Sequence, residues 1–176
     1  VEDFGAKGDN SRDCTTAIQA AINYAEAVAH AGGAVLNKAG IGGEVRLGSG
    51  VFQISSQLTI NSDGVYLVGE GEGTTIIRQT DETENGIVMK TVNTLTDANA
   101  DRPGNVGVKN LSIYIDPSDQ TDSLSGYGIV AQLVQFTCEN VNVRGFRRSF
   151  HVSGSLRRSL ITNCVSECDR GGTIAV

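Results

Sequence analysis

The chain has 176 residues, 20 acidic and 14 basic side chains, and a formal net charge of −6. That length is sufficient for one domain with a hydrophobic core. The acidic balance disfavours contact with the phosphates of a nucleic acid, and no apolar run approaches the roughly 20 residues that span a bilayer. We therefore expect neither a nucleic acid nor a membrane as a partner.

The composition favours many short strands joined by tight corners. The sequence contains 22 glycines, 2 prolines and no tryptophan, and glycine is the residue that adopts positive φ at turns. The four cysteines are Cys14, Cys138, Cys164 and Cys168, with no Cys-x-x-Cys pair that would bind a metal. We expect buried free thiols, the alternative being a Cys164–Cys168 bridge across a sharp corner.

The first elements in the chain are a short strand, a turn with glycines and an amphipathic helix. Apolar residues recur at three- and four-residue steps from Ala17 onward, which predicts a helix from about Thr15 to Ala29 with one apolar stripe. Asp13 stands at the expected N-cap, and the pair Gly32-Gly33 is the expected end. An ordinary surface helix of an α/β domain is the alternative.

The opening pattern V-x-D-F-G-A-K-G-D, followed by T-x-A-I-Q-A-A-I, resembles the N-terminal region of pectate-lyase-like right-handed parallel β-helix proteins. That group includes phage tailspikes, polysaccharide lyases, polygalacturonases and mannuronan epimerases. The resemblance implies an all-β fold, a right-handed parallel β-helix (β-solenoid) with an N-terminal capping α-helix. A stack of coils needs such a cap because its end exposes apolar side chains and unpaired backbone groups.

Two strand-and-corner segments follow the helix. Residues 34–40 look like a short insertion, and residues 44–54 then alternate around a glycine corner, with Val45, Leu47, Phe52 and Ile54 as inward candidates. The segment G-E-G-E-G-T-T-I at 69–76 is similar to the first full coil of the family. We considered a phosphate-binding loop there and rejected it, because Glu70 and Glu72 repel an anion and no helix pattern follows.

A repeat emerges in the second half of the chain. Three segments align on Asn110, Asn140 and Asn163, which are 30 and 23 residues apart, the first interval being lengthened by the polar loop 117–125. A second series aligns the segments that begin at Gly128, Ser149 and Gly172. A period in the low twenties is typical of one β-solenoid coil.

The recurring asparagines are predicted to be structural. Asparagine tolerates the left-handed backbone conformation of a tight corner, and its side-chain amide can bond to the asparagine one coil away. A glycan contact from Asn140 is the alternative.

The residues that could carry chemistry follow the strands of the second half. Asp116 ends a predicted strand, Asp119 and Asp122 lie in the loop beyond it, and a basic group surrounds the next coil: Arg144, Arg147, Arg148 and His151. The resemblance implies polysaccharide binding along the flank, and guanidinium groups bind the carboxylates of uronic acids. We take Asp116 and Arg144 as catalytic candidates and Arg147 and His151 as glycan-binding candidates; the alternative is a solvated coil face with turn aspartates.

The signatures of the family's enzymes are missing from this chain. The segment Phe150-His151-Val152-Ser153-Gly154 is similar to the strand on which mannuronan epimerases carry D-P-H-E, and the polygalacturonase signatures N-T-D, D-D, G-H-G and R-I-K are absent. Because the loop 117–125 could also carry Asp116 away from Arg144, we expect no complete catalytic set. The sequence indicates no cofactor and no metal site; calcium, which some family members use, is not indicated.

These observations predict a single domain over residues 1–176, with a strand, cap and insertion in 1–43 and opening coils in 44–176, as the first part of a longer β-helix. The expected partner is a surface or cell-wall polysaccharide. The protein would be part of a phage tailspike or receptor-binding fibre, trimeric and located in the virion tail or outside the cell. The alternatives are a secreted polysaccharide lyase or glycoside hydrolase and a non-catalytic glycan-binding β-helix.

Overall fold

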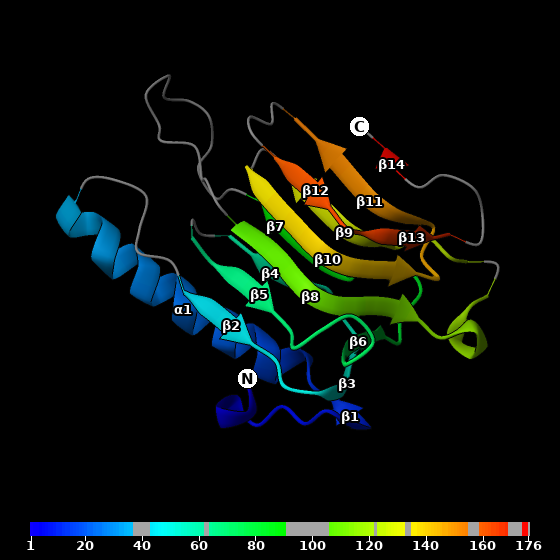
Figure 1. Ribbon diagram of the computed structural model, residues 1–176. Helices are drawn as coiled ribbons and strands as arrows, with labels where there is room; N and C mark the ends of the chain where they lie inside the picture. The colour runs from blue at the N-terminus through cyan, green and yellow to red at the C-terminus, as the bar shows by residue number, and fades with distance from the viewer. Residues whose placement is uncertain are drawn as a thin grey trace.

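The fold is mostly β, and its strands form two parallel sheets (Figure 1). The computed structural model describes residues 1–36, 43–61, 64–90, 106–121, 123–132, 135–154, 159–168 and 174–175. The strands are β1 (Asp9–Asp13), β2 (Glu44–Arg46), β3 (Gly50–Ile54), β4 (Leu58–Ile60), β5 (Tyr66–Val68), β6 (Thr75–Gln79), β7 (Ile87–Lys90), β8 (Val106–Ile115), β9 (Tyr127–Gln132), β10 (Phe136–Arg144), β11 (Arg148–Ser153), β12 (Leu160–Thr162), β13 (Val165–Glu167) and β14 (Ile174–Ala175). The helical segments are η1 (Glu2–Phe4), α1 (Thr15–Leu36) and η2 (Pro117–Asp119).

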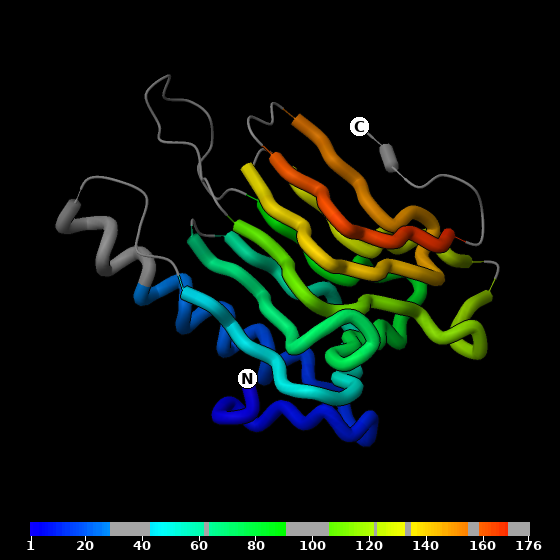
Figure 2. Tube along the Cα trace, viewed as in Figure 1, coloured from blue at the N-terminus to red at the C-terminus, as the bar shows by residue number. Residues whose placement is uncertain are grey.

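Successive passes of the chain lie on top of one another. The first sheet has the order β1-β3-β6-β8-β10-β12, with β2-β5 beside β8 and β13 beside β10, and the second has the order β4-β7-β9-β11-β14. Figure 2 shows the colour rising through the stack from the N-terminal segment to the last strands. Each strand inside the two orders therefore pairs with strands one pass earlier and one pass later, and the strands at the ends of the orders pair on one side.

The core lies between the two sheets and consists of apolar columns in register. In the first sheet Phe52, Ile77, Ile113 and Val143 are direct partners and all fully buried. The second sheet contributes the column of Leu58, Ile87, Ile129 and Phe150. Branched aliphatic and aromatic side chains form these columns because successive side chains of a strand point to opposite faces, so one set of each strand meets the interior.

The predicted inward positions after the helix are confirmed. Val45, Leu47, Phe52 and Ile54 are all buried, as the period-2 pattern required.

Among the described residues, no helix has the length and apolar character needed to cross a membrane. All four cysteines are free thiols, with Cys14 and Cys138 buried and the other two half-buried.

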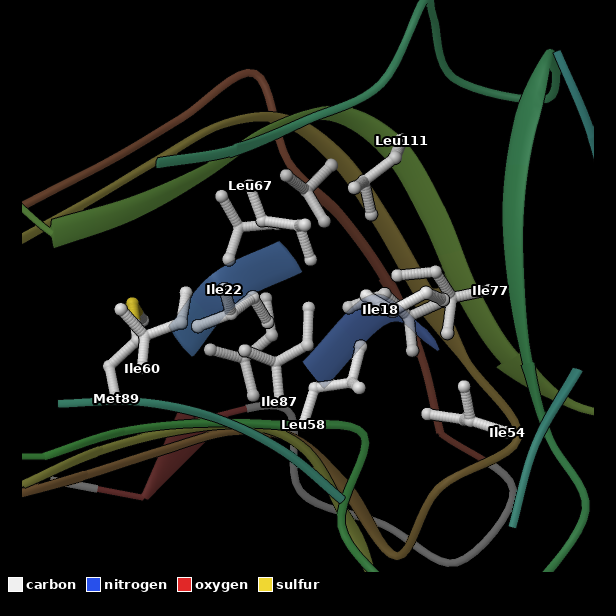
Figure 3. Close-up of a cluster of buried hydrophobic side chains, with 14 of the residues drawn as sticks. Ile18, Ile22, Ile54, Leu58, Ile60, Leu67, Ile77, Ile87, Met89 and Leu111 are labelled. Atoms are coloured by element: carbon white, nitrogen blue, oxygen red, sulfur yellow. The ribbon is translucent and has the colours of Figure 1, made fainter. Parts of the chain in front are cut away.

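Helix α1 covers the N-terminal end of the stack, where it packs against β2, β4 and η1. Ile18 and Ile22 are fully buried, and Figure 3 shows them among the side chains of the core cluster. The side-chain amide of Gln19 donates to the carbonyl oxygen of Thr59 at 2.9 Å and accepts from the Thr59 amide at 2.8 Å. Gln19 thus satisfies backbone groups of the edge strand β4 that no neighbouring strand pairs.

Both predicted ends of the helix need correction. The first helical bond runs from the Ile18 amide to the Cys14 carbonyl oxygen, so Cys14 is the N-cap; Asp13, one residue earlier, accepts from the Thr15 amide at 2.8 Å. The helix also continues through Gly32-Gly33 to Leu36, because glycine costs only about 1 kcal/mol relative to alanine inside a helix and does not block it. Residues 37–40 of the predicted insertion lie outside the described residues.

The recurring asparagines stand at corners of the first sheet. Asn110, Asn140 and Asn163 all have positive φ, between 51° and 54°, and the flanking strand pairs bring them opposite one another in successive passes. The side-chain amide of Asn140 donates to the side-chain oxygen of Asn110 at 2.9 Å. These residues turn the backbone within β8 and β10 and between β12 and β13.

The second predicted repeat differs from the structure by one residue at its last member. The sequence alignment set Phe150 opposite Thr173, whereas Phe150 pairs with Ile174. That register places another isoleucine after Ile129 and Phe150, and one residue of slip would have exchanged the inward and outward sets of the strand.

Candidate functional site

A row of polar residues crosses the outer face of the first sheet. Gln53, Arg78, Tyr114, Arg144 and Glu167 are partners in register on β3, β6, β8, β10 and β13. They alternate with the buried column described above, so their side chains are directed away from the core. The row therefore presents polar groups, spaced by about 4.8 Å from strand to strand, along one flank of the stack.

A pocket of about 430 Å³ lies at the C-terminal end of this row. It is lined by Tyr114, Ile115, Asp116, Pro117, Gln120, Arg144, Gly145 and Glu167. Its charged side chains come from the ends of three strands that are adjacent in the sheet: Asp116 follows β8, Arg144 ends β10 and Glu167 ends β13. The volume is in the lower part of the range of small-molecule sites.

Asp116 is held in place by the short helix η2 that it caps. One of its carboxylate oxygens accepts from the Ser118 hydroxyl at 2.6 Å and from the Ser118 amide at 2.9 Å. The bond from the Ser118 hydroxyl, the bond from its amide and the charge of Arg78 lower the pKa of Asp116 below its ordinary value. Asp116 is therefore a carboxylate at neutral pH, with its second oxygen available to accept hydrogen bonds.

Arg144 lies between the two acidic residues and against an aromatic ring. Its guanidinium carbon is 5.4 Å from the centre of the Tyr114 ring, a cation–π contact that orients the planar group. Arg144 is exposed, and among the described residues no carboxylate is within salt-bridge distance of it. Its N–H donors are consequently free for a ligand.

The loop after β8 forms one wall of the pocket and is tied down at three points. Gln120 donates from its side chain to the Gly145 carbonyl oxygen at 3.1 Å. Asp119 forms a salt bridge of 2.7 Å with Arg78, and the largely buried carboxylate of Glu82 accepts from Thr121. The loop therefore holds Asp116 beside Arg144 instead of carrying it away; Asp122 lies outside the described residues.

The structure separates the other two candidate residues from this pocket. Arg147 is exposed in the turn between β10 and β11, where its amide donates to the Gly126 carbonyl oxygen. His151 is on β11 in the second sheet and stacks on Tyr127, with ring centres 4.9 Å apart. The basic group of the sequence thus contributes Arg144, and not Arg147 or His151, to the lining of the pocket.

Glu167 is a lining residue that the sequence reasoning missed. It follows Arg144 by 23 positions, the same interval that separates Asn140 from Asn163, so the coil period contained the signal. Extending that period from the asparagines to the strand ends would have placed Glu167 beside Arg144.

Among the described residues, no group of three or more histidine, cysteine or carboxylate side chains is arranged to hold a metal ion.

Comparison with known proteins gives the family. Residues 1–169 match the rhamnogalacturonase A/epimerase, pectate lyase-like family, and the chain belongs to that family. Alginate lyase 7 of Azotobacter vinelandii is 35% identical over 134 residues, which cover 72% of this chain and 14% of the relative. Mannuronan C5-epimerase AlgE3 of the same organism is 38% identical over 113 residues, or 64% of this chain and 6% of the relative.

Two solved structures share the fold. ORF18 of Geobacillus virus E2 has a TM-score of 0.64 and 22% identity, with 93% of this chain and 35% of that protein covered. The A-module of Azotobacter vinelandii mannuronan C-5 epimerase AlgE4 has a TM-score of 0.50 and 23% identity, with 98% of this chain and 52% of that module covered. The chain thus spans a small part of the curated relatives and about half or less of these two structures.

Proposed function

We propose that residues 1–176 are the opening part of a right-handed parallel β-helix, with α1 as its N-terminal cap, and that this part binds a surface or cell-wall polysaccharide at the Asp116–Arg144 pocket. The observation that carries the proposal is the meeting of Asp116 and Arg144 in one pocket on the flank of the stack. A carboxylate accepts from sugar hydroxyls and a guanidinium donates to them, so the pair can bind two hydroxyls of one ring.

We place this β-helix in a phage tailspike or receptor-binding protein that binds and degrades polysaccharide, works as a homotrimer and is located in the virion tail. The fold shared with the Geobacillus virus E2 protein is compatible with that setting. Degradation would then depend on residues outside this chain, because the D-P-H-E and polygalacturonase signatures are missing here.

A secreted polysaccharide lyase or hydrolase is the second candidate, and the identity with alginate lyase 7 supports it. The two settings differ in assembly, since a tailspike is trimeric and a free extracellular enzyme of this kind is monomeric. Light scattering on the purified full-length protein separates them: a trimer supports the virion setting, and a monomer overturns it.

Binding is tested by probing an array of immobilised polysaccharides with the full-length protein and with two arginine variants. Arg144→Ala should lose binding at least about tenfold, because it removes the charge-assisted donors of the pocket. Arg12→Ala, at an exposed arginine on β1, serves as the control and should bind as the wild type does. Equal binding by all three proteins, or no binding to any polysaccharide, would contradict the proposed site.

A further inference from the structure

The charges that line the pocket favour one class of sugar over another. Asp116 and Glu167 are the acidic side chains of the lining, and Arg144 is the only cation among the lining residues. Arg78, the next cation along the row, is neutralised by its 2.7 Å salt bridge with Asp119. The lining therefore carries one positive and two negative charges.

Glu167 is the direct register partner of Arg144. Neighbouring strands are about 4.8 Å apart, so the side chains of Arg144 and Glu167 start from adjacent positions on the same outer face, and a ligand carboxylate that binds at Arg144 is repelled by the carboxylate of Glu167. At equal separations the repulsion between two carboxylates equals the attraction of one for the guanidinium. Asp116 adds a second repulsion from the β8 side of the pocket.

Neutral hydroxyl groups do not meet this repulsion. The second oxygen of Asp116 accepts from a hydroxyl, and the exposed carboxylate of Glu167 does the same on the other side of Arg144. The guanidinium, oriented by Tyr114, donates to a hydroxyl between them. Alternating acceptors and donors match the hydroxyls around a hexose ring.

We propose that the pocket takes a neutral sugar unit and discriminates against a uronate, and that Glu167 is the residue that sets this preference. The inference rests on the proposed polysaccharide-binding function and names the substrate class for its site. It departs from the uronate preference that the arginine-rich sequence indicated, because Arg147 and Arg148 do not line the pocket and leave Arg144 to act alone.

The experiment measures dissociation constants of the full-length protein for neutral hexose oligosaccharides and for oligogalacturonates and alginate oligomers of matched length. The wild type should bind a neutral series more tightly than either uronate series. Glu167→Gln should strengthen uronate binding about fivefold, the effect of removing one charge at about one strand spacing in a water-like dielectric, and leave neutral binding within about twofold. In the wild type, added salt should narrow the difference in affinity between the neutral and the uronate series. In Glu167→Gln, added salt should have little effect on that difference.

Glu139→Gln is the matched control. Glu139 is also on the first sheet and changes the net charge equally, but it pairs with Lys109 at 3.1 Å and does not line the pocket. It should leave both affinities unchanged. Glu167→Ser keeps a small polar group at the same exposed position and should show the same gain in uronate binding. It tests whether the gain comes from loss of the charge and not from the glutamine side chain itself.

The outcomes separate the inference from the function on which it rests. Tighter binding of uronates than of neutral sugars by the wild type, with Arg144→Ala abolishing it, would overturn the neutral-sugar inference and leave the binding site intact. Binding of no series, or binding that Arg144→Ala does not weaken, would overturn the proposed function. An equal gain in uronate affinity in Glu139→Gln and Glu167→Gln would show that the effect comes from net charge alone and that Glu167 does not determine the preference.

Discussion

The side-chain amide of Asn140 donates to the side-chain oxygen of Asn110, one pass below it, at 2.9 Å. Both residues have left-handed backbone conformations, with φ of 53° and 54°. The bond therefore links two corners of the stack at the points where an ordinary residue would be strained. A substitution at Asn140 changes both the hydrogen bond and the backbone strain. The choice of the new residue separates these two contributions to stability.

Asn140→Ala should lower the free energy of unfolding by about 2–3 kcal/mol, since it loses the hydrogen bond and imposes positive φ on alanine. Asn140→Gly keeps the corner unstrained and should cost only about 1 kcal/mol. Urea unfolding followed by circular dichroism measures both values.

Asn163 provides the control for this pair of variants. It has the same conformation, with φ of 51°, but is exposed, and no side-chain bond to Asn140 is recorded for it among the described residues. Asn163→Gly should therefore change the free energy of unfolding by less than about 0.5 kcal/mol. Equal losses in Asn140→Gly and Asn163→Gly would show that the inter-pass bond contributes nothing.

The buried face of helix α1 gives the next prediction. Ile18 is fully buried at the end of the stack, and Ile18→Asp should destabilise the protein by several kcal/mol because an unpaired charge enters the core. Ile18→Ala should cost about 2–5 kcal/mol. Thermal unfolding is the measurement, with Tyr24→Ala on the exposed face of α1 as control; a Tyr24→Ala loss as large as that of Ile18→Ala would contradict this placement of the helix.

Gly145 and Gly73 have nearly the same positive φ, 78° and 75°, in different surroundings. An alanine Cβ at Gly145 would lie 2.5 Å from the Ile115 carbonyl oxygen, whereas one at Gly73 meets nothing within 4 Å. Gly73→Ala should cost about 1–2 kcal/mol from the backbone alone, and Gly145→Ala should cost more. Gly145→Ala should also weaken glycan binding, since it moves the backbone next to Arg144; equal effects of the two variants in unfolding and binding assays would show that the close contact is irrelevant.

The local alternation of residues 44–54 was sufficient to predict their inward residues. Phe52 and Ile54 are buried because each strand has two faces and one of them meets the core. The short strand expected before the first glycine turn was wrong: the helical segment η1 (Glu2–Phe4) stands there, and the first strand, β1 (Asp9–Asp13), follows the turn. The position of Asp116 beside Arg144 was harder to predict, because it depends on how Arg78, Glu82 and Gly145 hold the intervening loop. Such contacts join residues far apart in the sequence and leave no periodic trace in it.

The register at Phe150 shows a second limit. It depends on the number of residues in each pass, and that number varies with the loops, so a one-residue error exchanges the faces of a strand. The helix ends were misplaced for a local reason: Asp13 bonds to the Thr15 amide from outside the helix, and the helix continues past the glycine pair to Leu36. Neither the bond of Asp13 nor the continuation of the helix past the glycine pair corresponds to a motif that could be recognised in the sequence.

Residues 1–176 alone should show no turnover on acidic or neutral polysaccharides. A general acid for glycoside cleavage is a carboxyl kept protonated by an apolar site, and neither Asp116 nor Glu167 is buried. The assay follows new reducing ends and unsaturated uronate absorbance during prolonged incubation. Product that disappears in Asp116→Ala would place the active site in this pocket and contradict the expectation.

The protonation of Asp116 provides the last prediction. The bonds from the Ser118 hydroxyl and amide, with the charge of Arg78, lower the pKa of Asp116 in the folded protein. A lowered carboxyl pKa stabilises the fold above the pKa of the unfolded chain, and this stabilisation is lost as pH falls through the folded-state pKa. Sugar binding that needs the carboxylate should follow the same folded-state pKa and persist below the ordinary range of aspartate.

Ser118→Ala should raise the pKa of Asp116, so that binding is lost at higher pH; Ser123→Ala, at an exposed serine of the same loop, should leave the profile unchanged. An NMR titration of the Asp116 carboxyl carbon, alongside glycan affinity at each pH, measures both curves. An Asp116 pKa at or above its ordinary value, or a binding profile that Ser118→Ala does not move, would contradict this account.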